Sequence, residues 1–93
     1  VAIDPATGSG VEGDVADQAS RVMENLALVL SDLGLGFDDV AKTTIFLADM
    51  ADFAVVNEIY GSYFTGEPPA RATVQAAGLP AGFLVEIEAI AAR

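Results

Sequence analysis

Residues 14–33 constrain the fold of this chain most, because apolar side chains recur there at steps of three and four. That spacing predicts an α-helix with one buried face. The apolar positions are Val15, Ala19, Val22, Met23, Leu26, Val29, Leu30 and Leu33. Asp14 is placed to cap the start of the helix, and Gly34 and Gly36 are placed to end it. A helix with one apolar face must pack against a second layer of structure.

A β-strand is predicted at 40–47, which is short and rich in β-branched and aromatic residues. Two sets of side chains alternate along it, Val40, Lys42, Thr44 and Phe46 on one face and Ala41, Thr43, Ile45 and Leu47 on the other. Since both faces are partly apolar, we expect a central strand that is covered on both sides.

A second helix is predicted after 40–47, with Asp49 or Asp52 as its cap and Gly66 as its end. Its expected buried stripe consists of Phe53, Val56, Ile59, Tyr60, Tyr63 and Phe64. The stiff connector 67–69 leads to two further strands, at about 70–76 and 83–91, which the turn-rich residues 78–82 join. The order helix–strand–helix–strand–strand predicts one α+β domain over 1–93, with three strands facing two helices.

The first residues of the chain have a different character. Pro and Gly are frequent over 4–13, which indicates an exposed loop. The residues 1–5 (VAIDP) read like the end of a strand entering a turn. We therefore expect that chain upstream of Val1 is missing from this sequence.

Composition excludes several classes of function. The chain of 93 residues contains neither His nor Cys, which excludes a Ser-His-Asp triad, a thiolate nucleophile and a zinc site of the usual ligands. With 14 acidic and 4 basic residues, its net charge of −10 disfavours nucleic acid and anionic membranes as partners. Apolar residues make up 53% of this short chain, so we expect other subunits to cover part of its surface. The lack of Cys suits a reducing cytoplasm, where we expect the protein.

Arg71 is the most informative polar residue, because it begins a predicted strand in a chain that is short of cations. Its planar guanidinium can grip a carboxylate through two parallel hydrogen bonds. The residues alone leave open a second interpretation, in which Arg71 forms an ordinary surface ion pair with one of the many acids.

Four other positions are candidates for the same site. Glu86 and Glu88 share a strand face, where two carboxylates raise the pKa of one another, and one of them could move a proton near neutral pH. From the residues alone, the preferred interpretation of the pair is a solvated strand face or an edge protected by charge. Thr73 lies on the strand face of Arg71 and could orient a ligand or a water. Asn57 lies beside the buried stripe of the second helix, where it could bond across a cleft.

Several separated blocks of the sequence together resemble the Rid (YjgF-type) family, also described as the translation-inhibitor or perchloric-acid-soluble family. The blocks are 40–53 (VAKTTIFLADMADF), Val56-Asn57, Tyr60 with Tyr63-Phe64, Pro69-Ala70-Arg71, Leu79-Pro80 and 85–91 (VEIEAIA). The resemblance implies a chorismate-mutase-like α+β fold and a homotrimer with a central barrel. It also implies ligand clefts between adjacent subunits, and first strands that this chain lacks.

The resemblance further implies hydrolytic deamination of reactive enamines and imines, such as 2-aminoacrylate, to 2-keto acids and ammonia. Arg71 matches the carboxylate-binding Arg of the family, and Glu86 matches the acid that holds the attacking water. Glu88 would then be structural, and the reaction would need no metal or cofactor. Thr73 stands where many members have Cys, and the loop 65–69 is shorter than usual.

Two alternatives remain at this stage. A trimer that binds small carboxylates without catalysis would use the same cleft, and Thr73 and the short loop favour it slightly. An endoribonuclease or translation inhibitor, as reported for some relatives, is disfavoured by the charge and by the lack of His.

Overall fold

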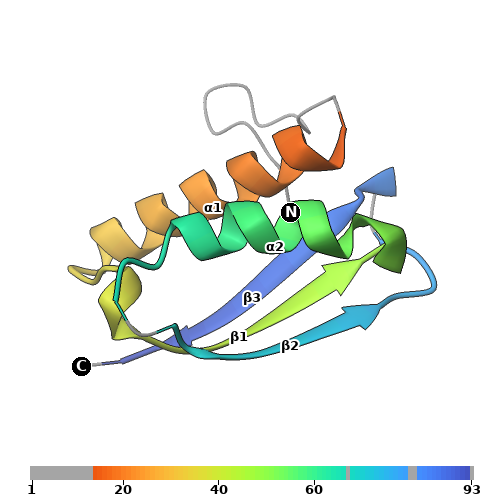
Figure 1. Ribbon diagram of the computed structural model, residues 1–93. Helices are drawn as coiled ribbons and strands as arrows, with labels where there is room; N and C mark the ends of the chain where they lie inside the picture. Colours follow the sequence, from red (N-terminus) through yellow and green to blue (C-terminus); the bar gives the residue numbers. More distant parts are fainter. Residues whose placement is uncertain (1–13, 67, 80–81, 93) are drawn as a thin grey trace.

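A computed structural model describes residues 14–66, 68–79 and 82–92 of the chain. Five main elements follow one another: α1 (Val15–Asp32), β1 (Val40–Leu47), α2 (Phe53–Ser62), β2 (Ala70–Gln75) and β3 (Val85–Ala91). Short 3-10 turns precede β1 and α2, at Phe37–Asp39 and Met50–Asp52. Both helices lie on one side of the three strands (Figure 1). The predicted α+β arrangement of two helices on three strands is confirmed.

The sheet has the order β2-β1-β3, so the strand predicted to be central is central. β1 runs parallel to β2 and antiparallel to β3. Parallel neighbours need a long crossover connection, and α2 supplies it between β1 and β2. On the helix face of β1, Thr43, Ile45 and Leu47 are buried. On the other face Val40 is buried, Thr44 and Phe46 are half-buried and Lys42 is exposed. The expected cover on both sides is therefore only partial within the described part of a single chain.

The predicted signals at both ends of α1 are confirmed. The Asp14 carboxylate accepts a hydrogen bond from the Asp17 backbone N–H at 3.0 Å. At the other end Gly34 adopts a φ of 72°, and the Leu35 N–H reaches back to the Leu30 carbonyl at 2.8 Å. This left-handed backbone conformation favours glycine. The hydrogen bond from Leu35 satisfies a carbonyl group that the last turn of α1 would otherwise leave without a partner.

We expect Asp14→Ala to lower the free energy of unfolding by about 1 kcal/mol, because the N–H group of the first turn loses its acceptor. Urea denaturation followed by circular dichroism measures the change. Asp32→Ala is the matched control, since it removes a carboxylate from the negative end of the same helix and should leave stability equal or slightly higher. Equal destabilisation by both variants would contradict the capping role.

The apolar stripe of α1 is buried only in part. Val22, Met23 and Leu30 are buried as predicted, but Val29 is 56% exposed and Leu33 is 68% exposed. The prediction for these two positions is wrong for the single chain, because they lie at the end of α1 where no other described element covers them. Val29 lines an open groove of about 200 Å³ between α1 and β3, together with Val22, Asn25, Leu26 and Ile87.

α2 is shorter than the sequence predicted, since it ends at Ser62 and not near Gly66. The two aromatic residues that follow, of which Tyr63 caps the helix, pack on the ring of Phe37. The Phe37 ring lies 5.6 Å from the ring of Tyr63 and 5.3 Å from the ring of Phe64. This tertiary aromatic contact outweighs the local preference for another helical turn.

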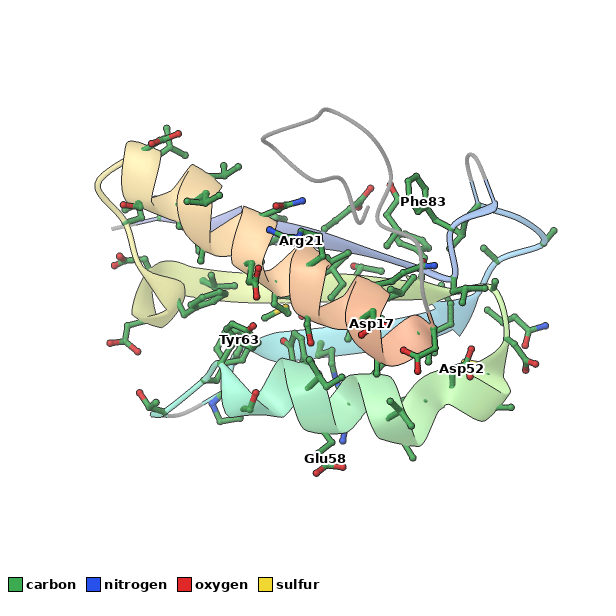
Figure 2. All side chains as sticks on the ribbon, turned by 90° about the horizontal axis from the view of Figure 1, so that it is seen from above. Asp17, Arg21, Asp52, Glu58, Tyr63 and Phe83 are labelled. Atoms are coloured by element: carbon green, nitrogen blue, oxygen red, sulfur yellow. The ribbon has the colours of Figure 1, made fainter. Side chains whose placement is uncertain are left out.

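The core lies between the helices and the sheet. Its largest fully buried apolar side chains are Met23, Ile45, Leu47, Val56 and Val85. Figure 2 shows α1 and α2 side by side over the strands, with Glu58 directed away from α1. Gln18 is buried among the apolar residues of α1, and its side-chain oxygen accepts a hydrogen bond from the Leu84 N–H at 2.8 Å. This bond ties α1 to the chain entering β3.

Strand positions agree closely with the prediction. The central strand occupies 40–47 as expected, and the last two strands occupy 70–75 and 85–91 within the predicted 70–76 and 83–91. The 4–13 loop, the expected strand end at 1–5, and Glu67, Pro80 and Ala81 of the predicted connectors lie outside the described residues.

Candidate functional site

Arg71 lies on the helix face of the sheet, near the start of the edge strand β2. It pairs in register with Thr43 of β1, and paired residues in neighbouring strands share a face. The guanidinium donates a hydrogen bond to the Asn57 side-chain oxygen of α2. Among the described residues, no carboxylate oxygen lies within 4.0 Å of the guanidinium. Within this part of the chain, Arg71 therefore keeps its charge available, and the surface ion pair considered above is absent.

Two aromatic rings of α2 hold the guanidinium in place. Its central carbon lies 5.4 Å from the ring centre of Phe53 and 5.6 Å from that of Tyr60. Both distances are within the range of a cation–π interaction. Tyr60 is fixed in turn, because its hydroxyl lies 2.6 Å from the Thr43 hydroxyl in the buried interior. Contacts from α2 and β1 thus restrain an otherwise exposed, flexible side chain.

A cavity of about 380 Å³ opens beside this guanidinium. We call it the Arg71 pocket, and it is lined by Asn57, Tyr60, Gly61, Pro68, Pro69 and Arg71. It combines one cation and one amide with an aromatic ring and two proline rings. Its size and lining suit a small anionic molecule with a short apolar part.

Thr73 follows Arg71 on the same strand face, as expected, and is half-buried. Its hydroxyl oxygen is buried without a hydrogen-bond partner. Thr73 does not line the Arg71 pocket. A buried hydroxyl without a partner is costly, so this position has spare hydrogen-bonding capacity.

Glu86 lies on the opposite, open face of the sheet. It pairs with Phe46 of β1, whereas Arg71 pairs with Thr43, so the two residues are also offset by about 10 Å along the strands. The described chain therefore brings Arg71 and Asn57 together and keeps Glu86 apart from them. Glu86 is half-buried and Glu88, two residues on, is exposed on the same face.

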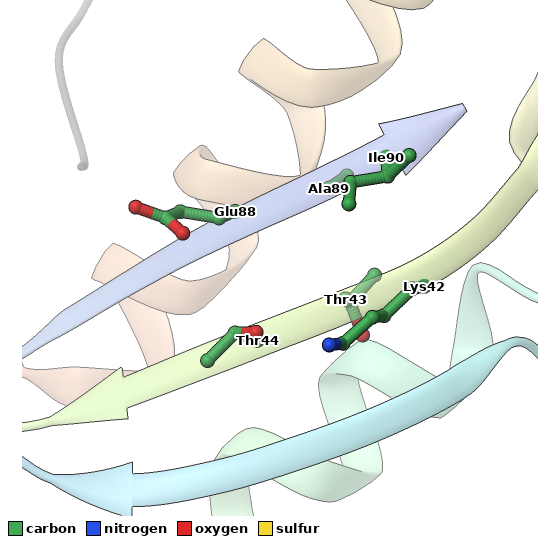
Figure 3. A pocket seen from close by; sticks show the side chains of 6 residues that line it. All are labelled: Lys42, Thr43, Thr44, Glu88, Ala89 and Ile90. Carbon is green, nitrogen blue, oxygen red and sulfur yellow. The ribbon is translucent and has the colours of Figure 1, made fainter. Parts of the chain in front are cut away.

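A second, smaller hollow of about 170 Å³ lies between β1 and β3. Its lining residues are Lys42, Thr43, Thr44, Glu88, Ala89 and Ile90. Figure 3 shows Lys42 and Glu88 on neighbouring strands at this hollow. Of the candidate residues it contains Glu88, but not Arg71, Glu86, Thr73 or Asn57.

Sequence reasoning did not assign Phe53, Tyr60 or Thr43 to the site. Phe53 and Tyr60 were predicted as core residues of α2, and Tyr60 is indeed 4% exposed. The sequence did hint at Thr43, because its spacing of two residues places it with Ile45 and Leu47 on the buried face of β1. A polar residue in such a position must find a partner within the protein.

The described residues contain neither a cluster suited to a metal ion nor a helix suited to a membrane. In that part of the chain, no group of three or more His, Cys, Asp or Glu side chains is placed to hold a metal ion. The same residues include no helix that is both long and apolar enough to cross a bilayer.

Comparison with known proteins places the chain in a family. Residues 1–93 match the family described as Endoribonuclease L-PSP. Protein DfrA of Myxococcus xanthus is 62% identical over 91 residues, which are 98% of this chain and 70% of that protein. The mouse 2-iminobutanoate/2-iminopropanoate deaminase is 52% identical, over 98% of this chain and 67% of the enzyme.

A solved structure supports the same assignment. The protein of unknown function YyfA from Yersinia pestis, described as a member of the conserved Rid protein family, superimposes with a TM-score of 0.94 at 45% identity. The match covers 97% of this chain and 72% of that one. The present chain thus spans about two thirds to three quarters of the proteins compared. On sequence and on fold, the chain belongs to the Endoribonuclease L-PSP family, which includes the Rid proteins.

Proposed function

We propose that this protein hydrolyses small 2-imino acids, and the enamines in equilibrium with them, to 2-keto acids and ammonia. The observation that carries the proposal is the Arg71 guanidinium, which Asn57, Phe53 and Tyr60 hold beside a cavity of about 380 Å³. A fixed guanidinium without a carboxylate partner among the described residues suits a ligand carboxylate. The mouse relative named for 2-iminobutanoate and 2-iminopropanoate supports the substrate class.

The reaction balances with water alone. The enamine first tautomerises to the imine, water then adds its oxygen to the imine carbon, and the carbon–nitrogen bond breaks to release ammonia and leave the keto group. Arg71 binds the carboxylate and fixes the carbon relative to the water. Glu86 takes a proton from the attacking water and passes it to the imine nitrogen, and it then moves the hydroxyl proton of the resulting carbinolamine to the same nitrogen, which leaves as ammonia. Asn57 holds Arg71, and Thr73 offers a hydrogen bond to the ligand or the water.

The proposal sets this chemistry in a homotrimer, with each cleft shared by two subunits. Arg71 and Glu86 lie on opposite faces of one sheet, so a single described chain cannot apply both to one small substrate. A cleft between subunits can combine Arg71 of one chain with Glu86 of the next. The open sheet face offers apolar contact for such an assembly, since Val74 is 43% exposed and Ile90 is 63% exposed.

A coupled assay tests the proposed activity. A threonine or serine dehydratase generates the free imine, and the release of keto acid is followed with and without the purified protein. We expect the protein to raise the rate of release above that of spontaneous hydrolysis, in proportion to its concentration. An unchanged rate at any concentration would contradict the deaminase proposal.

The same assay separates the two alternative functions. A protein that only binds small carboxylates would bind 2-oxobutanoate saturably and leave the rate of imine hydrolysis unchanged. The family description names an endoribonuclease, so the protein is also incubated with RNA. With a net charge of −10, we expect no cleavage that depends on Arg71.

A further inference from the structure

A buried hydrogen bond joins α2 to β1 through two residues that are neighbours of Arg71. The hydroxyl groups of Thr43 and Tyr60 are 2.6 Å apart, and the two residues are 1% and 4% exposed. This short contact joins side chains 17 residues apart in the sequence. It is a specific polar contact inside an apolar core, where a lost partner is not replaced by water.

The two hydroxyl groups are connected to Arg71 from two sides. The Tyr60 ring is one of the two rings next to the guanidinium, at 5.6 Å. Thr43 is the residue that faces Arg71 in the register of β1 and β2. The strand that orients the backbone of Arg71 therefore also anchors the ring that orients its side chain.

We infer that Thr43 is a positioning residue, which fixes the Tyr60 ring through the hydroxyl contact and thereby sets the direction of the Arg71 guanidinium in its pocket. The expected effect on ligand binding rests on the proposed function, in which the Arg71 guanidinium binds the carboxylate of the ligand. Neither residue touches the ligand through this bond. The bond acts on binding only through Arg71.

A purely structural role makes a different prediction. If the hydroxyl pair only stabilised the fold, its loss would lower the free energy of unfolding and leave folded molecules with an unchanged Arg71. A positioning role requires that folded molecules carry a redirected or more mobile guanidinium. The Nε–H signal of Arg71 in an NMR spectrum reports this directly, because aromatic rings shift the resonances of nearby protons.

The experiment uses Thr43→Val and Tyr60→Phe, each of which breaks the bond from one side with little change in shape. Thr43→Ser keeps a hydroxyl and is the matched control. We expect both single variants to move or broaden the Arg71 Nε–H signal, and the double variant to do so no more than either single variant. Thr43→Ser should resemble the unaltered protein. Because the two substitutions break one bond, their effects should not add.

Binding of 2-oxobutanoate gives the functional readout at a temperature where every variant is folded. We expect the dissociation constant to rise on the order of tenfold in Thr43→Val, in Tyr60→Phe and in the double variant. If Thr43→Val does not fold, Tyr60→Phe and Thr43→Ser still decide the question. An unchanged Arg71 signal, unchanged binding in spite of a moved signal, or fully additive effects would each overturn the inference.

Failure of this inference differs from failure of the proposed function. If Arg71→Ala leaves the binding of 2-oxobutanoate unchanged, the guanidinium does not hold the carboxylate. That result would refute the proposed function, and with it the expected effect of Thr43 on ligand affinity. Should Arg71→Ala abolish binding while Thr43→Val has no effect, only the positioning role is refuted.

Discussion

Replacement of Arg71 by Ala is expected to lower kcat/KM for imine hydrolysis by roughly 10²–10⁴-fold, because two charge-assisted hydrogen bonds to the substrate carboxylate are lost. The fold should persist, since Arg71 is exposed at an edge strand and lies outside the buried core. The dehydratase-coupled assay measures the loss of activity, and circular dichroism with thermal unfolding verifies the fold. Retained activity in a folded variant would remove Arg71 from the proposed mechanism.

Two control variants sharpen this measurement. Arg71→Lys keeps the charge but loses the planar fork, so we expect KM to rise while part of the activity remains. Arg21→Ala removes another arginine, whose guanidinium pairs with Glu24 on the surface of α1 at 3.1 Å. It should leave turnover unchanged, because Arg21 does not line the Arg71 pocket. A loss in Arg21→Ala as large as in Arg71→Ala would indicate a general effect of net charge.

Replacement of Glu86 by Gln should lower kcat by roughly 10²–10⁴-fold, the usual contribution of a positioned acid–base group. The binding of 2-oxobutanoate should change little, because the proposed contact with the carboxylate comes from Arg71 and not from Glu86. Glu88→Gln is the matched control, since Glu88 lies two positions away on the same strand face and is exposed. Equal losses in both variants would show that charge on this face matters, and not the chemistry of Glu86.

Mixed oligomers test whether the site is shared between subunits. Arg71→Ala and Glu86→Gln chains are mixed in equal amounts, unfolded together and refolded. If each cleft takes Arg71 from one subunit and Glu86 from its neighbour, about a quarter of the clefts should contain both native residues and activity should partly return. If both residues act within one chain, no mixture can restore activity, and the proposal of a shared cleft would fail.

The elements of this fold were predictable because their signals are local. Asp14 and Gly34 mark the ends of α1 through contacts with its own first and last turns, and period-two alternation marks β1. The end of α2 was not predictable in the same way. Its last turn competes with the contacts that Tyr63 and Phe64 make with Phe37, which comes from a distant part of the chain.

Two residues of the Arg71 pocket were predictable from the sequence, but their arrangement was not. Arg71 was singled out by its rarity and its position, and Asn57 by its place beside the buried stripe of α2. Their hydrogen bond, and the separation of Arg71 from Glu86 by the thickness of the sheet, depend on strand order and register. Period-two alternation fixes which residues of one strand share a face, but it does not fix how different strands align.

The parallel pair β1 and β2, with α2 between them, has a consequence for how activity can change in descendants of this protein. This one unit contains Thr43, Phe53, Asn57, Tyr60 and Arg71, whereas Glu86 comes from β3. On the proposed mechanism, mutations in β3 would silence turnover and leave recognition of an organic acid intact. Such a lineage would start as a catalyst and end as a metabolite receptor, with no rebuilding of the part that recognises its ligand.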